Sequence, residues 1–436
     1  MGRMRDREVW RLALPAIASN VTVPLLGICD TAISGHLGSP VYLAAIAAGS
    51  MMLNVIFWLF GFLRAGTTGL AAEAVGQDSA RRQREIFTQS FWLAIGVGML
   101  ILLLSPLMCD LLLRVVGVEP EAASFARKYF TICIFGAPAQ LGIMAANGWM
   151  IGMQTTTRPM IVAISVNVIN IILSLTAVFG LRAGFVGIAY GTMISNWLGL
   201  CLALILARGK APGKKLFAPF KTAWKTGAAK FAKVNTDLFF RSMCIMAVSL
   251  AVTSIGARLG NVTMAANAVL MQFFLFFSYF MDGFAYAAEA MVGKASGAKD
   301  HAGIRSAVIT LLKISAWMAG IFVLIYLFFT PQIVGLLTDE PSVRAAAVAL
   351  KPWMVVLPVV SVACFIFDGF YIGLTETRRM LWATLLAVIL FFGISFIHKS
   401  GIGLPDNPTL WTAFLSYLLL RGVLLAFFLK LKKADA

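Results

Sequence analysis

An acidic side chain, Asp30, stands inside the first long apolar stretch of the chain, in the run NVTVPLLGICDTAISG. A carboxylate that loses water there without a partner is very costly, so an acid in such a segment indicates a proton or ion site. Pro24 lies six residues earlier and cannot donate to the carbonyl of Asn20, which predicts a bend beside the acid. The alternative is an acid near the outer end of its helix that reaches toward lipid headgroups.

Amides and hydroxyls occur in two later apolar stretches. The first contains Asn167, Asn170 and Ser174, and the second contains Thr192 and Asn196. Asn170 and Ser174 are four residues apart and share a helical face, as do Thr192 and Asn196. These groups either form a functional polar cluster or make the hydrogen bonds between helices that membrane bundles use routinely.

The second half of the chain carries its own charged candidates. Asp237 and Arg241 are spaced i and i+4 on a helix, which predicts a structural ion pair. Asp282 and Glu289 are seven residues apart and therefore share one face. Asp282 and Asp368 belong either to a structural network or to a second coupling site.

No arrangement of residues in the sequence points to catalysis. The three histidines lie at or near predicted loops, and the six cysteines are scattered without a CxxC spacing, so we expect no metal site and no disulfide framework. Neither a Walker A sequence nor GxSxG is present. We therefore expect a protein that is not an enzyme, uses no cofactor and depends on an ion gradient or on the gradient of its substrate.

Composition places these residues in a membrane. Of the 436 residues, 60% are hydrophobic and 13% are charged, whereas a soluble domain carries about a quarter charged residues. The apolar stretches are long enough for helices that span a bilayer and lack the alternation of barrel strands. The predicted fold is an all-α polytopic membrane protein with twelve transmembrane helices, at residues 12–34, 43–74, 87–113, 127–151, 160–180, 184–207, 234–257, 265–292, 306–330, 346–373, 380–398 and 409–429.

The net charge of +17 is carried mostly between these stretches. Most lysines and arginines collect on one side if both termini are cytoplasmic, so the positive-inside rule predicts that orientation. The orientation of the chain in the membrane explains its net positive charge better than binding to nucleic acid would. We therefore expect no nucleic-acid partner. The basic connector at 208–233 could also contact anionic membrane lipids. The N-terminus lacks a small-residue cleavage site, which argues against a removable signal peptide.

The two halves of the sequence repeat. GWMIGMQTTTR begins at Gly148, and GFYIGLTETRR begins at Gly369, about half the chain later. AAEAVGQ and AAEAMVGK form a second pair with one insertion, which matches Glu73 with Glu289 and suggests gating or capping for both acids. Six spans per half give two copies in the same orientation around a cavity, a common plan for transporters. The predicted domains are an N-lobe at 1–207, the connector at 208–233 and a C-lobe at 234–436.

Several long motifs in the same order resemble one family of transporters. They include LALPAIASNVTVPLLGICDTAISGHLG at 12–38, FLRAGTTGLAAEAVG at 62–76, GARLGNVTMAANAVL at 256–270 and FDGFYIGLTETRRM at 367–380. On these motifs the chain is similar to the multidrug and toxic compound extrusion (MATE) family, in the branch of the DNA-damage-inducible protein F (DinF). The resemblance implies two six-helix lobes in a bacterial inner-membrane antiporter. It also implies export of cationic or amphipathic small molecules by a monomer.

The resemblance assigns roles to individual residues as well. It makes Asp30 the proton-coupling acid and maps the polar cluster of the N-lobe onto Asn170 and Thr192. Ser174 departs from the family pattern, which often has a second acid there, so coupling to H+ through Asp30 is favoured over a charged Na+ site. Coupling to Na+ remains an alternative, as does a lipid-linked precursor flippase of the same superfamily. Few basic residues lie inside the spans, which argues against a flippase for an anionic headgroup.

Overall fold

The computed structural model describes residues 2–35, 39–117, 119–225, 227–398, 401–402 and 406–434. The chain forms two compact units, the first comprising Ala18–Asn235 and the second comprising Met1–Ile17 together with Thr236–Ala436. Helices account for nearly all of the described residues, so the predicted all-α class is confirmed. Two long helices, α1 (Gly2–Gly35) and α10 (Ala228–Arg258), supply residues to both units.

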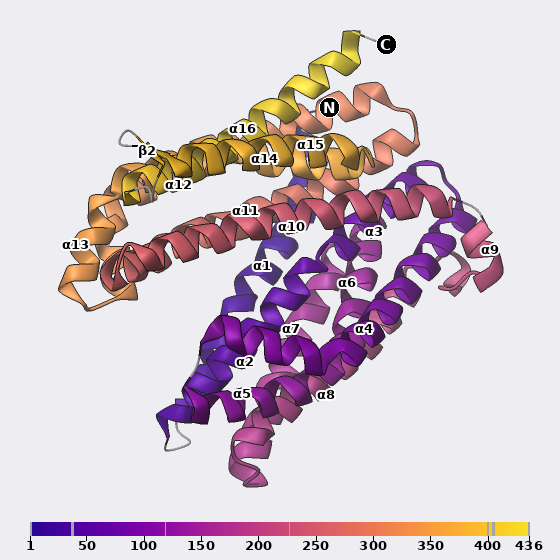
Figure 1. The fold of residues 1–436 in the computed structure, drawn as a ribbon. Coiled ribbons are helices and arrows are strands. Elements are labelled where there is room, and N and C mark those ends of the chain that lie inside the picture. Colours follow the sequence, from indigo (N-terminus) through magenta and orange to yellow (C-terminus); the bar gives the residue numbers. More distant parts are fainter. Residues whose placement is uncertain are drawn as a thin grey trace. The chain divides into compact units, whose positions relative to one another are not determined.

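The other elements of the first half follow one another with short turns. They are α2 (Pro40–Leu59), α3 (Phe62–Gly76), α4 (Ala80–Val116), α5 (Pro120–Cys133), η1 (Ile134–Gly136), α6 (Ala137–Gly152), α7 (Thr157–Leu175), η2 (Thr176–Gly180), α8 (Phe185–Arg208), η3 (Pro212–Lys214) and α9 (Phe220–Lys225). Within this unit α6 packs against α3, α4 and α8 (Figure 1).

The second half continues after α10. Its elements are α11 (Asn261–Gly297), α12 (His301–Leu337), α13 (Pro341–Ala349), α14 (Lys351–Gly373), α15 (Thr377–Phe396), β1 (Ile397–His398), β2 (Gly401–Ile402) and α16 (Asn407–Ala434). Helix α14 packs against α11, α12 and α16 (Figure 1). The first residues of α1 belong to the same unit, where the ring of Trp10 meets that of Phe284 with centroids 5.4 Å apart.

Each predicted span overlaps a helical segment of the structure. Among the described residues, eleven segments are long and apolar enough to cross a membrane. The helices extend beyond the apolar spans because polar residues form their caps. Ser79 Oγ accepts a hydrogen bond from the backbone N–H of Arg82 at the start of α4. At the start of α12, the corresponding place in the second half, Asp300 Oδ1 accepts a hydrogen bond from the backbone N–H of Gly303.

The repeat of the sequence has a structural cause in two close helix contacts. A β-carbon at Gly148 of α6 would collide with the backbone of Arg64 in α3. A β-carbon at Gly369 of α14 would collide in the same way with the backbone of Ala285 in α11. The interval along the chain from Gly148 to Gly369 equals the interval from Arg64 to Ala285. Glycine is required because only a residue without a side chain lets the two backbones approach so closely.

The same geometry corrects the predicted match between Glu73 and Glu289. A β-carbon at Gly152 would lie 2.7 Å from the carbonyl oxygen of Thr68, and one at Gly373 would lie 2.9 Å from that of Glu289. Glu289 therefore takes the place of Thr68 in the repeat, and Glu73 corresponds to Lys294. The two AAEA motifs are therefore not structurally equivalent. The interval between them along the chain differs from the interval that separates equivalent helix contacts of the two halves.

Candidate functional site

Asp30 lies on α1 with 7% of its surface exposed. Its Oδ1 atom is buried and has no hydrogen-bond partner among the described residues, and no ion pair joins Asp30 to any of them. Helix α1 is continuous across Pro24, whose side chain is exposed. The acid is therefore buried, and no base among the described residues neutralises its charge.

A chain of hydrogen bonds joins the predicted amides and hydroxyls of α7 and α8. Asn170 Nδ2 donates to Thr192 Oγ1 across 3.0 Å, and Ser174 Oγ donates to Asn170 Oδ1 across 3.4 Å. Asn170 and Ser174 are fully buried. Gly191 of α8 makes this possible, since a β-carbon there would lie 3.0 Å from the backbone nitrogen of Ser174. The close approach of the two helices brings Thr192 beside Asn170.

Two side chains of α5 complete this cluster and were missed by the sequence analysis. The hydroxyl of Tyr129 interacts with the charge of Asp30 and forms hydrogen bonds with Thr192 and with Ser50 of α2, the latter across 3.4 Å. The thiol of Cys133 interacts with Asp30, Tyr129 and Thr192. Both side chains lie in an apolar run, YFTIC, that contains no acid or amide, so the sequence did not indicate a polar site there. We call Asp30, Tyr129, Cys133, Asn170, Ser174 and Thr192 the N-half cluster.

Irregular backbone lies next to this cluster on two helices. Helix α5 ends at Cys133 and passes through the 3-10 turn η1 into α6. Helix α7 ends one residue after Ser174 and continues as the π-helix η2. Short 3-10 turns commonly connect helices, whereas π-helical turns within helices are rare and are frequently found at functional sites.

The remaining two predicted polar residues of this half have other contacts. Asn167 Nδ2 donates to the carbonyl oxygen of Thr22 across 3.2 Å, which ties α7 to α1 two residues before Pro24. Asn196 is buried against η1, where a β-carbon at Gly136 would lie 3.0 Å from its Nδ2. Asn167 therefore holds the segment that precedes Pro24, and Asn196 packs one helical turn from Thr192.

The second half contains a cluster in which Asp368 of α14 is shared by two arginines. Oδ2 of Asp368 accepts from Nη2 of Arg241 on α10 and, across 2.5 Å, from Nη2 of Arg421 on α16. Arg421 is 5% exposed and also donates to the hydroxyl of Tyr417 across 3.0 Å. The thiol of Cys364 interacts with both arginines and with Asp282, so Asp282 borders the same cluster.

This arrangement shows that the predicted ion pair between Asp237 and Arg241 is wrong. Asp237 is buried, accepts a hydrogen bond from Thr377 Oγ1 across 3.0 Å and pairs with Arg378 at 3.6 Å. Arg241 turns instead to Asp368, far away in the sequence. A spacing of four residues permits a pair on a helix, but the packing of α10 against other helices decides which partner each side chain reaches.

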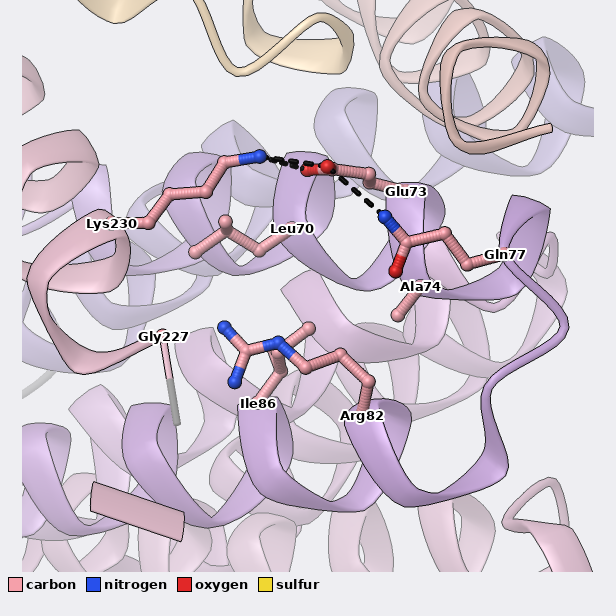
Figure 2. Close-up of a pocket in the computed structure, with 8 residues that line it drawn as sticks. All are labelled: Leu70, Glu73, Ala74, Gln77, Arg82, Ile86, Gly227 and Lys230. Atoms are coloured by element: carbon pink, nitrogen blue, oxygen red, sulfur yellow. Dashed lines mark hydrogen bonds and ion pairs between the residues drawn. The ribbon is translucent and has the colours of Figure 1, made fainter. Parts of the chain in front are cut away.

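A cavity of about 180 Å³ lies between α3, the start of α4 and the residues around the start of α10. Lys230 Nζ contacts the two carboxylate oxygens of Glu73 at 2.7 and 2.6 Å, and Arg82 points into the same space (Figure 2). Gln77 Nε2 donates to Glu73 across 3.3 Å, while Leu70, Ala74 and Ile86 form an apolar wall. The ion pair between Glu73 and Lys230 thus links the end of α3 to the beginning of α10.

The two clusters differ in what they can do chemically. The described side chains that interact with Asp30 are the hydroxyl of Tyr129 and the thiol of Cys133, so the acid can take up or release a proton, or offer oxygen ligands to a hard cation, without breaking an ion pair to a described residue. Asp368 instead accepts charge-assisted hydrogen bonds from two guanidinium groups, so its carboxylate is already engaged in ion pairs. The described residues include no group of three or more histidine, cysteine or acidic side chains that could hold a metal ion.

Comparisons with known proteins agree with this architecture. The chain is 36% identical over 422 residues to the DNA damage-inducible protein F of Escherichia coli (strain K12), which covers 97% of this chain and 91% of that protein. It is 25% identical to a probable multidrug resistance protein NorM of Acinetobacter baylyi, with 88% and 87% covered. A crystal structure of MATE in the bent conformation has a TM-score of 0.85 at 18% identity and covers 99% of this chain and 96% of that chain.

A family model described as MatE matches the chain twice, at residues 15–176 and 238–397. Each match falls in one half, in keeping with the repeat that the glycine contacts reveal. Matches over both halves, together with a relative of 36% identity along nearly the whole chain, establish that this protein belongs to the MatE family.

Proposed function

We propose that this protein is a secondary active exporter that moves organic cations or other amphipathic toxicants out of the cell in exchange for protons. Membership of the MatE family and the likeness to a probable multidrug resistance protein support the class of substrate. The positive-inside rule supports an inner-membrane protein with both termini in the cytoplasm. We propose that a single copy suffices, since each chain has both halves of the repeat.

The buried and unneutralised carboxyl of Asp30 is the observation that carries the proton-coupling proposal. A coupling acid has to change its protonation state during each cycle, and the polar but uncharged groups around Asp30 allow that change. Asp368 differs because losing its charge would leave the buried Arg421 and the partly buried Arg241 without their shared acceptor. We therefore assign coupling to the first half and a structural role to Asp368.

Protonation of Asp30 would act on α1 through two neighbouring features. Pro24 supplies no backbone N–H, which leaves α1 with a weak point six residues before the acid. Asn167 holds the carbonyl of Thr22 on the other side of that point. In this mechanism the ionised acid favours the substrate-binding state, and the protonated acid lets α1 bend near Pro24 and release substrate outward.

Ser174 favours protons over sodium as the coupling ion. It lies fully buried next to Asn170, at the position where a second acid would create a two-carboxylate cation site. Hard cations bind most tightly to sites with several charged oxygen ligands. With one carboxylate and several neutral groups, the N-half cluster suits a proton better than Na+.

The test is transport by the purified full-length protein in lipid vesicles, with a fluorescent cation as substrate and imposed pH or sodium gradients. We expect the pH gradient to drive efflux, and Asp30→Asn to abolish that dependence. Asp339→Asn removes an exposed acid between α12 and α13 and serves as the matched control. Transport by Asp30→Asn with an unchanged response to pH would overturn the assignment of Asp30.

A further inference from the structure

The segment between α8 and α10 is folded onto α4 and does not form a free linker. Gln89 Nε2 of α4 donates to the carbonyl oxygen of Ala223 across 2.7 Å. The backbone N–H of Ala218 donates to Thr88 Oγ1 across 2.9 Å. Residues 217–223 therefore lie along α4 about two to three turns from its start, with α9 beside that helix (Figure 1). From here on, the connector means residues 208–225, the part of the predicted segment 208–233 that precedes α10.

Aromatic side chains form one surface of this contact. The ring of Phe217 meets those of Phe87 and Phe91 of α4, with centroids 5.2 and 5.4 Å apart. Phe220 lies against Trp92, with centroids 6.3 Å apart. Phe217, Phe220 and Trp92 nevertheless keep 43%, 57% and 47% of their surfaces exposed. The connector and α4 thus share an apolar aromatic face that the protein itself leaves uncovered.

Exposed basic side chains flank these rings along the sequence, and the connector contains no acid to oppose them. The exposed basic residues are Arg208, Lys210, Lys214, Lys215, Lys221 and Lys225. The chain contains no Asp or Glu from 208 to 235. The contrast with Lys230 is informative, because Lys230 is neutralised by Glu73 at the cavity just beyond the connector (Figure 2).

We propose that the connector is a membrane-surface anchor that binds the headgroups of anionic phospholipids. Exposed aromatic rings favour the boundary between acyl chains and headgroups, and lysines around them attract the negative lipid surface. Phe217, Phe220 and Trp92 enter this boundary, while the lysines contact phosphate groups of the lipids. The proposal depends on the chain lying in a membrane and is independent of the transported substrate and of the coupling ion.

The charge pattern selects this partner over the others that a basic surface could take. A nucleic acid would need ring faces open for stacking, whereas the edge contacts of Phe217 and Phe220 with α4 leave only part of each ring exposed, which suits shallow entry into a lipid surface. A free phosphate ion would need a pocket with converging donors, whereas the lysines of the connector are dispersed along an exposed segment. An extended anionic lipid surface provides an apolar boundary for the rings and dispersed negative headgroups for the lysines.

The experiment uses the full-length protein in nanodiscs of phosphatidylcholine with a trace of photoactivatable lipid. One sample contains a phosphatidylglycerol probe and the other a matched phosphatidylcholine probe, and labelled peptides are mapped by mass spectrometry. We expect the phosphatidylglycerol probe to label residues 208–225 at least about fivefold more than the phosphatidylcholine probe. Added salt should reduce this preference, since it screens exposed charges.

A triple variant and a matched control make the test specific. Lys214→Gln with Lys215→Gln and Lys221→Gln should remove most of the preference without changing the thermal unfolding of the protein, because these side chains are exposed. The control removes three exposed basic residues elsewhere in the same unit, Arg114, Lys128 and Arg182, and should keep the preference. Equal labelling by the two lipids, or equal losses in the two triple variants, would overturn the proposal.

Competition distinguishes a lipid surface from a site for small anions. Unlabelled phosphatidylglycerol should suppress labelling of the connector, and millimolar inorganic phosphate or a short RNA should not. Suppression by phosphate or by RNA would contradict the proposal and assign the surface to that ligand. Because none of these measurements involves transport, failure here leaves the proposed export function unaffected.

Discussion

Asn170 on α7 donates a hydrogen bond from Nδ2 to Oγ1 of Thr192 on α8, and the hydroxyl of Thr192 in turn donates to the carbonyl oxygen of Ile188. The side chain of Thr192 thereby links the amide of α7 to the backbone of α8. Tyr129 and Cys133 of α5 also interact with this hydroxyl and with Asp30. Thr192 therefore connects Asn170 on α7 to the two α5 side chains that interact with Asp30.

Thr192→Val should separate these two parts of the cluster. Valine has the shape of threonine but cannot accept the hydrogen bond, so a donor of the buried Asn170 amide loses its partner. We expect a loss of about 1 kcal/mol in the free energy of unfolding and slower proton-driven transport. Thr192→Ser keeps the hydroxyl and should retain the transport rate. Equal behaviour of the valine and serine variants in thermal unfolding and vesicle transport would contradict this role.

Ser174→Asp should change the ion that drives transport. The substitution places a second carboxylate next to Asn170 and on the same face of α7. Two carboxylates with neighbouring oxygen ligands suit a hard monovalent cation better than one does, so we expect a sodium gradient to stimulate efflux by this variant. Ser174→Asn has nearly the same size without the charge and should not respond. The measurement is vesicle transport with sodium or choline outside; a response from both variants would refute a role for charge.

Asp368→Asn should destabilise the second unit more than Arg421→Met does. Removing the shared acceptor leaves the buried Arg421 and the partly buried Arg241 without their carboxylate, and the loss approaches the roughly 3–5 kcal/mol of a broken buried pair. Removing Arg421 leaves the pair between Arg241 and Asp368 in place. Unfolding in detergent measures the difference between the two variants.

Asp237→Asn provides the control for this comparison. The asparagine can still accept the hydrogen bond from Thr377, and the pair that it loses, with Arg378, involves a mostly exposed arginine. A loss of stability as large as that of Asp368→Asn would indicate that Asp237 neutralises a buried base, contrary to the structure.

Gly148→Ala and Gly369→Ala should be equally damaging, although they lie in different units. In each case the new methyl group meets the backbone of a neighbouring helix, which cannot move aside as a flexible side chain would. We expect a loss of about 2 kcal/mol or more from overpacking. Gly96→Ala and Gly393→Ala are the matched controls, because a β-carbon at either position meets nothing within 4 Å. These controls should gain up to about 1 kcal/mol from better helix propensity.

Much of the fold follows from local features of the sequence. Each long apolar stretch predicted a helical segment, because the cost of burying an unsatisfied backbone in lipid forces such a stretch into a helix, whereas α9 in the basic connector was not predicted. Gly148 and Gly369 revealed the repeat, since close helix contacts require glycine at both places. Asp30, Asn170, Ser174 and Thr192 were found because polar residues are rare in such stretches.

Tertiary structure alone decided which of these groups meet. It paired Arg241 with Asp368 and not with Asp237, brought Tyr129 and Cys133 to the N-half cluster, and placed Glu289 opposite Gly373 in the position of Thr68. Hydropathy and spacing describe one helix at a time, whereas these contacts depend on the rotation and register of helices that are far apart in the chain. Packing sets both, because close contact is possible only where small residues on one helix meet the backbone of another.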